Sequence, residues 1–239
     1  MNARERMLGR LRAAAPTSIS ADDLKRLDER IDLHYDTCRA PAMSTQALVE
    51  SMQAMLTASH AEVFRATERT WPIWIAQRLA DAKVGRLLLD TSRAEGAALQ
   101  QALPSSIATR SYDRPIEAWK AELFDAVDAG FTVARSGIAS TGTLIVAPDA
   151  GSPRTMSLVP PLHIALVYAN TLHVDLHEAM RAEQWHAAMP ANLVLISGPS
   201  KTSDIQQTLA YGAHGPRELW VVIVEDDADQ ADDTHGENA

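Results

Sequence analysis

A loop rich in hydroxyl groups lies between two apolar runs near the C-terminus. Residues 197–204, Ser-Gly-Pro-Ser-Lys-Thr-Ser-Asp, follow the run LVLIS and precede a predicted short helix. Backbone N–H groups at the start of a helix, together with the helix dipole, favour a bound anion. The hydroxyls of Ser200, Thr202 and Ser203 add hydrogen-bond donors, so this loop can form a cradle for a phosphate or a carboxylate.

The same residues also have a purely structural interpretation. Ser203 followed by Gln206 fits a capping box, and Asp204 in the first turn favours the helix dipole without any ligand. The loop does not match the phosphate-binding loop of ATPases, since Ser200 stands where a glycine should precede Lys201. ATP hydrolysis is not predicted, and the anion cradle and the helix cap stay open as alternatives.

A second segment with glycine and hydroxyl residues spans 136–143, Ser-Gly-Ile-Ala-Ser-Thr-Gly-Thr. Glycine permits positive φ and a close approach of the backbone to a ligand, and the hydroxyls can bond to its oxygen atoms. The spacing does not match a dinucleotide-binding fingerprint, and a tight β-hairpin explains the same glycines. The pattern favours the hairpin, with a ligand-binding loop as the alternative.

His214 is the best candidate in the chain for proton transfer. It lies in Ala-His-Gly-Pro-Arg at 213–217, a segment of turn formers, so a structural turn is the first explanation. The unperturbed pKa of histidine lies near neutrality, which also suits an acid–base role or contact with an anion.

Metal chemistry has weaker support. His173 and His177 are spaced as neighbours on a helix, but Arg181 stands where a zinc-protease helix carries its second histidine, so an exposed amphipathic helix is favoured. Cys38 is the only cysteine, which excludes an intrachain disulfide and any four-thiolate zinc or iron–sulfur centre built from this chain alone. We expect no metal site and no cofactor in this chain.

Alternating strands and helices must position these segments. From Ala61 onward, short β-like runs alternate with helix-length segments, which predicts an α/β fold with a central, mostly parallel sheet flanked by helices. Trp71 and Trp74 are predicted to anchor a helix to this sheet. Strands are predicted near 62–66, 86–89, 107–111, 131–135, 143–147, 164–168, 193–196 and 219–224, and helices near 72–82, 93–103, 116–126, 176–184 and 204–211.

The last of these elements predict one supersecondary unit. A strand at 193–196, a helix ending before Gly212 and a strand at 219–224 should form a β-loop-α-loop-β unit with a right-handed crossover. Its loops are expected at the carboxyl ends of the strands, where open α/β sheets bind ligands.

The chain is predicted to have three parts. Residues 1–60 form a helical extension, with one apolar stripe at Met7, Leu8 and Leu11, a second at 48–56 after Ser44-Thr45, and a polar, irregular stretch at 19–41 between them. Residues 61–224 form the main domain. Residues 225–239 form an acidic tail that we expect to be disordered.

Composition excludes several classes of protein. Hydrophobic residues make up 46% and charged residues 22%, as in soluble globular domains. The net charge of −9 is concentrated in the tail: seven of the 31 acidic residues lie in 225–239, leaving 24 against 22 basic residues, which gives no basic footprint for nucleic acid. No apolar stretch approaches the roughly 20 residues that span a bilayer, and the N-terminus lacks the apolar region of a signal peptide, so we expect a cytoplasmic protein.

Three segments, taken together, resemble the hallmark segments of the LUD-domain family, most closely its lactate-utilisation protein C branch. They are GIASTGTLIV at 137–146, SLVPPLHIALV at 157–167 and ISGPSKTSDIQQTLAYGAHGPRELWVVIV at 196–224. The resemblance implies a fold related to the sugar-phosphate isomerase and CoA-transferase superfamily. It also implies a three-protein system that oxidises L-lactate to pyruvate, in which the other two proteins carry the iron–sulfur clusters.

The resemblance also implies a ligand-binding cleft. One departure from the family pattern is Ser140, since many relatives carry a carboxylate there, so any acid–base role of that carboxylate cannot be transferred. Asp204 is the nearest alternative acid, and with His214 it forms the tentative catalytic pair. The residues expected to bind the ligand are Thr141, Gly142, Thr143, Gly198, Pro199, Ser200, Thr202, Gly215 and Pro216.

Three functions remain open at this point. The leading hypothesis is a cluster-free component of an L-lactate oxidation system, with a cleft for a small anion. The second is an independent enzyme that acts on a sugar phosphate or an acyl-CoA, with Asp204 and His214 as acid–base groups. The third is a non-catalytic assembly subunit whose N-terminal helices dock the cluster-bearing partners.

Overall fold

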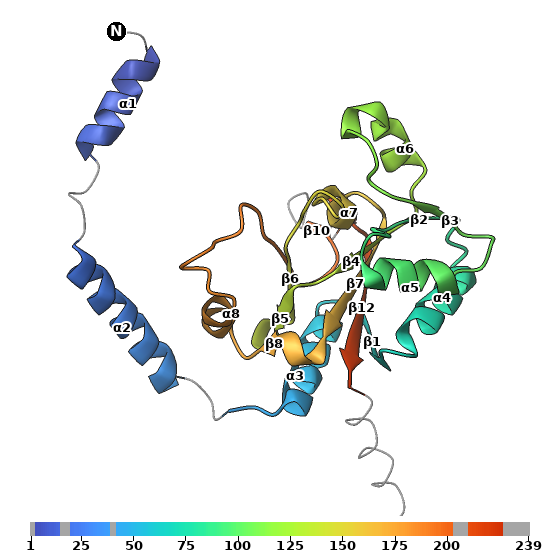
Figure 1. Ribbon diagram of the computed structural model, residues 1–239, viewed down its shortest axis with the longest axis horizontal. Helices are drawn as coiled ribbons and strands as arrows, with labels where there is room; N and C mark the ends of the chain where they lie inside the picture. Colours follow the sequence, from blue (N-terminus) through green and yellow to red (C-terminus); the bar gives the residue numbers. More distant parts are fainter. Residues whose placement is uncertain (1–2, 15–19, 39–41, 203–209, 227–239) are drawn as a thin grey trace, which may run out of the picture. The chain divides into compact units, whose positions relative to one another are not determined.

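Six parallel strands form the central sheet of the chain (Figure 1). The computed structural model describes residues 3–14, 20–38, 42–202 and 210–226. The strand order is β1-β12-β7-β4-β2-β3, and every neighbouring pair is parallel, so the predicted α/β class with a central, mostly parallel sheet is confirmed. The strands are β1 (Glu62–Thr67), β2 (Arg86–Leu88), β3 (Ala108–Arg110), β4 (Ala129–Val133), β7 (Leu162–Tyr168) and β12 (Glu218–Glu225).

Apolar runs explain two neighbouring interior strands of this sheet. β7 and β12 are buried along almost their whole length, as expected of parallel strands that are covered on both faces. Glu225, which the prediction assigned to the acidic tail, is instead the last residue of β12 and only 2% exposed. Its carboxylate accepts two hydrogen bonds of 2.7 Å from Arg65 of β1, and this paired charge allows it to be buried. The rest of the predicted tail, from residue 227, lies outside the described residues.

Two helices cover one face of the central sheet, α4 (Trp71–Asp81) and α5 (Ala94–Ala102) (Figure 1). Trp71 stacks on Phe131 of β4 with ring centroids 5.8 Å apart. Trp74 packs against Phe64 of β1 with centroids 3.9 Å apart. The predicted anchoring of this helix by its two tryptophans is confirmed.

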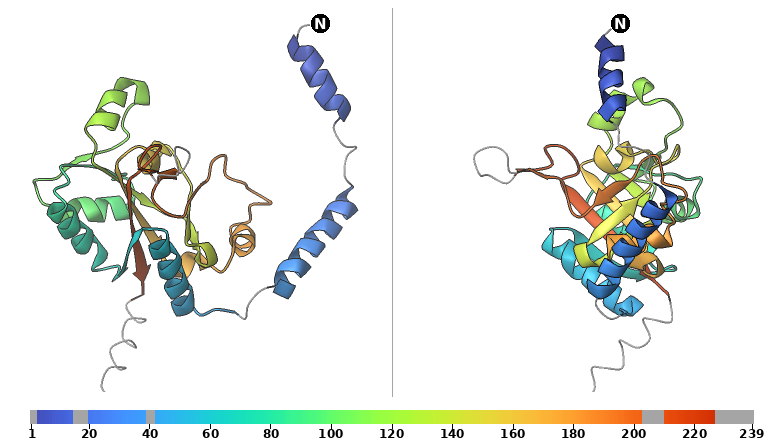
Figure 2. Two further views of the ribbon diagram at one scale, coloured as in Figure 1. Left: turned by 180° about the vertical axis from the view of Figure 1, so that it is seen from behind. Right: turned by 90° about the vertical axis from the view of Figure 1, so that its left-hand side faces the viewer.

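The opposite face is covered by α3 (Thr45–Ala58) and by a second, four-stranded sheet (Figure 2). α3 begins after Ser44, whose hydroxyl caps the helix by accepting a hydrogen bond from a backbone N–H of the first turn. Met52 and Leu56 of the apolar stripe predicted at 48–56 belong to the same core cluster as Val221 and Ile223, and Leu48 packs against it, whereas Met55 is 40% exposed. The buried residues of α3 are Val49, Met52 and Leu56.

The second sheet contains the hairpin predicted at 136–143. β5 and β6 pair antiparallel and are joined by the short 3-10 helix η2 (Ala139–Thr141) and Gly142, so the hairpin interpretation is confirmed. The outer face of this sheet packs against α8 (Leu176–Ala182). The strand order is β8-β5-β6-β9, with β5 (Ser136–Ile138), β6 (Thr143–Val146), β8 (Leu172–His173) and β9 (Val194–Ile196).

Shorter elements connect these layers. The helix predicted at 116–126 is divided at Trp119, because the backbone of this residue is not helical. The side chain of Trp119 is buried. The remaining elements are η1 (Ile116–Ala118), α6 (Lys120–Asp125), α7 (Thr155–Leu158), η3 (Ala169–Thr171), β10 (Lys201–Thr202) and β11 (Ala210–Tyr211).

The supersecondary unit predicted at the C-terminus is wrong. β9 pairs antiparallel with β6 in the second sheet, whereas β12 lies in the central sheet. The run around β9 was interpreted as a buried strand, but Leu195 is 50% exposed, as expected at the edge of a small sheet. Of the helix predicted at 204–211, residues up to 209 lie outside the described residues, and Ala210–Tyr211 is a strand.

Residues 1–42 form a unit of their own, with α1 (Ala3–Ala14) and α2 (Ala21–Cys38). The predicted helix around Met7 is confirmed, but the prediction of an irregular stretch at 19–41 is wrong. Its apolar residues Leu24, Leu27 and Ile31 have helical spacing, and the hydroxyl of Ser20 accepts a hydrogen bond of 3.1 Å from the N–H of Asp23 as an N-cap does.

The second unit spans residues 43–239. It therefore includes α3, which the prediction grouped with the extension at 1–60. The reason is tertiary, since the buried side chains of α3 complete the core between the two sheets. In the described part of the chain, no helix combines the length and the apolar character needed to cross a membrane.

Candidate functional site

Two of the predicted ligand-binding loops meet near the amino ends of β7 and β12. The backbone N–H of Ser200 donates to the carbonyl of Pro216 at 2.8 Å, and the N–H of Gly212 donates to the carbonyl of Ser200 at 3.0 Å. Gly215 packs so closely on Ser200 that a Cβ atom added to the glycine would lie 3.1 Å from the Cβ of Ser200. The segments around Ser200 and His214 are therefore in direct contact.

The third predicted segment reaches these loops through a chain of hydroxyl groups. The Oγ1 of Thr143 lies 2.7 Å from the Oγ1 of Thr141 and 2.8 Å from the Oγ of Ser197. Thr143 is only 6% exposed, whereas Ser197 is exposed. The hairpin thus contacts Ser197 through the hydroxyl of Thr143. Thr141 and Thr143 are therefore linked to the loop that begins at Ser197, as predicted.

A hollow of about 190 Å³ opens between these loops, and we call it the loop pocket. Its polar lining includes Ser197 and the buried His163 of β7, neither of which was predicted as a site residue. No lysine or arginine is found among its described lining residues. Six predicted residues line it: Gly198, Pro199, Ser200, His214, Gly215 and Pro216.

Other predicted residues lie elsewhere. Gly142 is buried with φ +59°, and a Cβ atom there would lie 2.8 Å from the backbone nitrogen of Leu56, so this glycine serves the close contact between the hairpin and α3. Thr202 is half-buried in β10 and does not line the pocket. Asp204, the second residue of the tentative catalytic pair, lies outside the described residues.

His163 is a neutral, buried imidazole at the wall of the loop pocket. Its side chain is 1% exposed, and burial lowers its pKa from 6.5 to about 3. Its Nε2 lies 2.8 Å from the Oγ1 of Thr132 in β4, which is itself 3% exposed. His214, by contrast, is exposed. Of these two imidazoles, only His214 is therefore open to solvent.

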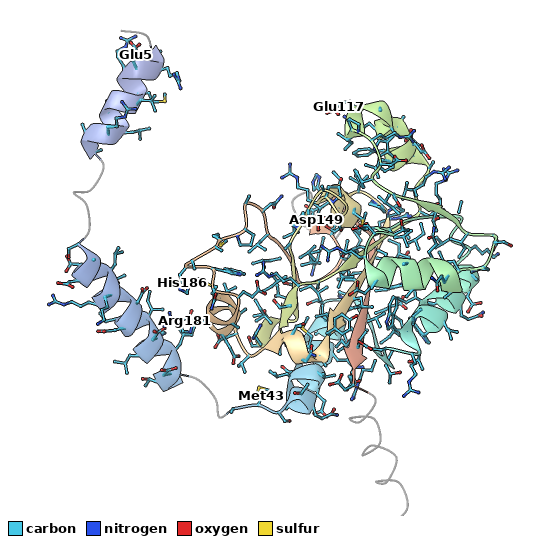
Figure 3. The ribbon with its side chains drawn as sticks, viewed as in Figure 1. Glu5, Met43, Glu117, Asp149, Arg181 and His186 are labelled. Carbon is cyan, nitrogen blue, oxygen red and sulfur yellow. The ribbon has the colours of Figure 1, made fainter. Side chains whose placement is uncertain are left out.

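A larger cavity, of about 390 Å³, lies at the carboxyl ends of β2, β4 and β6. We call it the arginine pocket, because Arg93 and Arg135 line it together with Asp90, Asp149 and Ser152. Asp149 lies in the loop that follows β6 (Figure 3). This is the end of a parallel sheet at which α/β folds usually bind ligands. None of the residues lining the cavity was predicted as a site residue.

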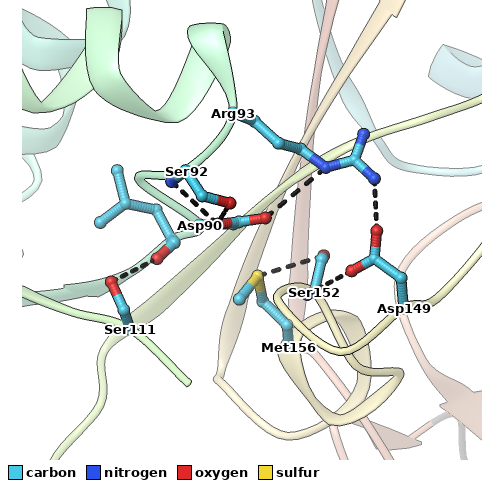
Figure 4. Close-up of polar contacts among 8 residues, drawn as sticks. Asp90, Ser92, Arg93, Ser111, Asp149, Ser152 and Met156 are labelled. Carbon is cyan, nitrogen blue, oxygen red and sulfur yellow. Dashed lines mark hydrogen bonds and ion pairs between the residues drawn. The ribbon is translucent and has the colours of Figure 1, made fainter. Parts of the chain in front are cut away.

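Asp149, Asp90 and Arg93 form a continuous polar network in this pocket (Figure 4). Arg93 donates a short hydrogen bond to Asp149 and lies 3.6 Å from a carboxylate oxygen of Asp90. The other oxygen of Asp90 accepts from the N–H and the hydroxyl of Ser92, at 3.0 and 2.6 Å. Burial acts to raise the pKa of Asp149, but hydrogen bonds from Arg93 and from the N–H of Ser152 outweigh it and lower that pKa.

Arg135 approaches the pocket from the end of β4. Its Nε lies 2.8 Å from a carboxylate oxygen of Glu183, whose side chain is only 9% exposed. Glu183 also accepts hydrogen bonds from the hydroxyl of Ser136 and, at 2.8 Å, from the indole nitrogen of Trp185. The carboxylate of Glu183 thus has three donors, Arg135, Ser136 and Trp185, and it holds the guanidinium of Arg135 in place.

A signal for this pocket exists in the sequence. Asp90 follows the strand predicted at 86–89, and Arg135 is the last residue of the strand predicted at 131–135. Charged residues at the carboxyl ends of two buried parallel strands should meet at the same edge of the sheet. The contact of Arg93 with Asp149, 56 residues later, has no such local signal.

The pair His173 and His177 is not a helical pair. His173 belongs to β8, and α8 begins only at Leu176, so the two residues do not lie on one face of a helix. No group of three or more histidine, cysteine or acidic side chains with metal-binding geometry is found in the ranges that the structure describes.

The sequence of this chain matches one family of known proteins. The LUD domain matches residues 49–224. An uncharacterized protein of Neisseria meningitidis is 37% identical over 230 residues, which cover 94% of each chain. A lactate utilization protein C of Halalkalibacterium halodurans is 33% identical over 109 residues, which cover 44% of this chain and 47% of that protein.

A solved structure has the same fold. It is a DUF162 family protein of Deinococcus radiodurans, with a TM-score of 0.57 and 22% identity. The similarity covers 77% of this chain and 99% of that one.

Proposed function

The chain belongs to the LUD-domain family, and from this premise we propose that it is a component of a system that oxidises L-lactate to pyruvate. The main support is the similarity to a protein that is named for lactate utilization. We propose further that the system includes two partner proteins that carry iron–sulfur clusters. The single cysteine of this chain fits that division, since it cannot supply a four-thiolate cluster by itself.

Within this role, we propose that the loop pocket binds a small anion. The observation that carries this proposal is the pair of backbone hydrogen bonds between the loops, Ser200 to Pro216 and Gly212 to Ser200. These bonds hold the hydroxyl of Ser200 and the imidazole of His214 beside one hollow. Hydroxyl and imidazole groups can both donate to a carboxylate or a phosphate.

The biological role is tested by growth. In a host without other lactate dehydrogenases, deletion of the gene is expected to abolish growth on L-lactate, and the intact gene is expected to restore it. Normal growth of the deleted strain would refute the proposed role.

The pocket is tested by the same complementation with two variants combined, Ser200→Ala and His214→Ala. We expect slower growth on L-lactate, because the anion loses two donors. The matched control is His186→Ala, since His186 is also exposed and lies outside the loop pocket, just beyond α8 (Figure 3). Full growth with the double variant would argue for an assembly role instead.

A further inference from the structure

The arginine pocket is separate from the loop pocket. None of the residues lining one cavity lines the other. The two are divided by the buried pair Thr132 and His163: Thr132 lines the arginine pocket, and His163 lines the loop pocket. A ligand in one cavity would therefore not contact the residues of the other.

The carboxylates of the arginine pocket are already satisfied. Asp90 accepts from Ser92 with one oxygen and faces Arg93 with the other. Asp149 accepts from the N–H of Ser152 with one oxygen and from Arg93 with the other. Each of the four carboxylate oxygens has a donor or a cation beside it, so these acids hold the pocket in shape and leave little acceptor capacity for a ligand.

The arginines, in contrast, keep free donors. Arg93 uses Nε and Nη2 in its contacts, and Arg135 uses Nε. Among the described residues, no hydrogen bond from Nη1 of Arg93 or from either terminal nitrogen of Arg135 is found. A guanidinium has five N–H donors in a planar fork and matches a carboxylate or a phosphate. The unused hydrogen-bonding capacity of the cavity is thus that of an anion site.

The volume and the apolar lining of the arginine pocket limit the kind of ligand that it can bind. A volume of about 390 Å³ lies within the usual range of small-molecule sites. Phe131, Val133, Val146 and Pro148 supply apolar lining. We propose that the arginine pocket binds a small metabolite with an apolar body, whose carboxylate or phosphate group is held by Arg93 and Arg135.

The proposal is tested by calorimetric titration of the purified full chain at pH 7. The probes are L-lactate and pyruvate for a carboxylate, and inorganic phosphate for a phosphate. Arg135→Gln is expected to weaken binding of the recognised probe about tenfold or more, because it removes charge-assisted hydrogen bonds. Competition between the probes tells which anionic group the pocket prefers.

The matched control is Arg114→Gln. The side chains of Arg114 and Arg135 are 46% and 42% exposed, and both form an ion pair with a glutamate, but Arg114 is not in the pocket. We expect unchanged affinity in this control. Arg93→Lys, which keeps the charge beside Asp149, is expected to weaken binding less than Arg93→Gln.

Two results would overturn the proposal. One is the absence of binding for all three probes at millimolar concentration. The other is binding that survives Arg135→Gln but is lost in Ser200→Ala, which would assign the anion to the loop pocket. A failure of the growth test leaves this experiment unaffected, since it measures binding by the isolated chain.

Discussion

Among the residues that the structure describes, His163 has the most strongly lowered pKa. It is a histidine held without charge in the interior, where its main polar contact is the hydroxyl of Thr132. A buried imidazolium would have to give up its hydration without a carboxylate to compensate for it, and this cost lowers the pKa to about 3. Because of this residue, the free energy of unfolding is expected to depend on pH in the acid range.

We predict that His163 reduces stability as the pH falls. Between about pH 6.5 and about pH 3 the unfolded chain binds a proton at this residue and the folded chain does not. The free energy of unfolding should therefore fall with decreasing pH, by up to about 1.4 kcal/mol per pH unit from this group. Urea unfolding of the chain and of His163→Gln between pH 7 and pH 4 measures the difference in slope. His186→Gln should keep the slope of the natural chain, and equal slopes for His163→Gln and the natural chain would contradict the prediction.

At the scale of elements, the contact of α3 with the hairpin joins the N-terminal part of the second unit to its second sheet. Gly142 has a left-handed conformation and lies against the end of α3, close to Met55 and Leu56. The hydroxyl of Ser51 adds a hydrogen bond of 3.1 Å to the carbonyl of Ala139. The same hairpin positions Thr143 behind Ser197, so its packing on α3 also supports the loop pocket.

Gly142→Ala is expected to destabilise the chain. An added Cβ atom meets the backbone of α3 at 2.8 Å, and a left-handed alanine alone costs roughly 1 to 2 kcal/mol. Chemical denaturation should show a loss of at least about this size. The control is Gly9→Ala, because no atom lies within 4 Å of a Cβ atom added there and alanine is the better helix former. A variant Gly142→Ala as stable as the natural chain would mean that this contact is not tight.

At the scale of the whole molecule, the second unit contains its own core. The described part of α1 has no buried residue, and the apolar side chains Leu24, Leu27 and Ile31 of α2 are exposed. The core between the two sheets instead begins with Val49 of α3. The described residues of the core clusters therefore all belong to the second unit.

We predict that a chain shortened to residues 43–239 unfolds at the same denaturant concentration as the full chain. Tryptophan fluorescence suits the measurement, since all five tryptophans follow residue 43. A further shortening to 61–239 removes the buried side chains of α3 and is expected to prevent stable folding. A lower midpoint for 43–239 would show that the first unit contributes to the stability of the second.

Sequence patterns alone predict the α/β class and most strands of the central sheet. Apolar runs predicted β1, β7 and β12, the paired tryptophans predicted the anchoring of α4, and the glycines at 137 and 142 predicted the hairpin. Such patterns report whether a segment is buried and whether its period is that of a strand or a helix. The loops around Ser200 and His214 were also predicted as neighbours, and they are in contact.

The fold, and no local pattern, sets which segments become partners. It pairs β9 with β6 rather than placing it beside β12, joins Arg93 to Asp149, and brings Arg65 to Glu225 across 160 residues. The physical reason is that a local pattern records the environment of a residue but not the identity of its neighbour. The neighbour is set by how the two sheets and their helices pack, and Arg65 shows the effect, because the buried carboxylate of Glu225 is stable only with a partner beside it.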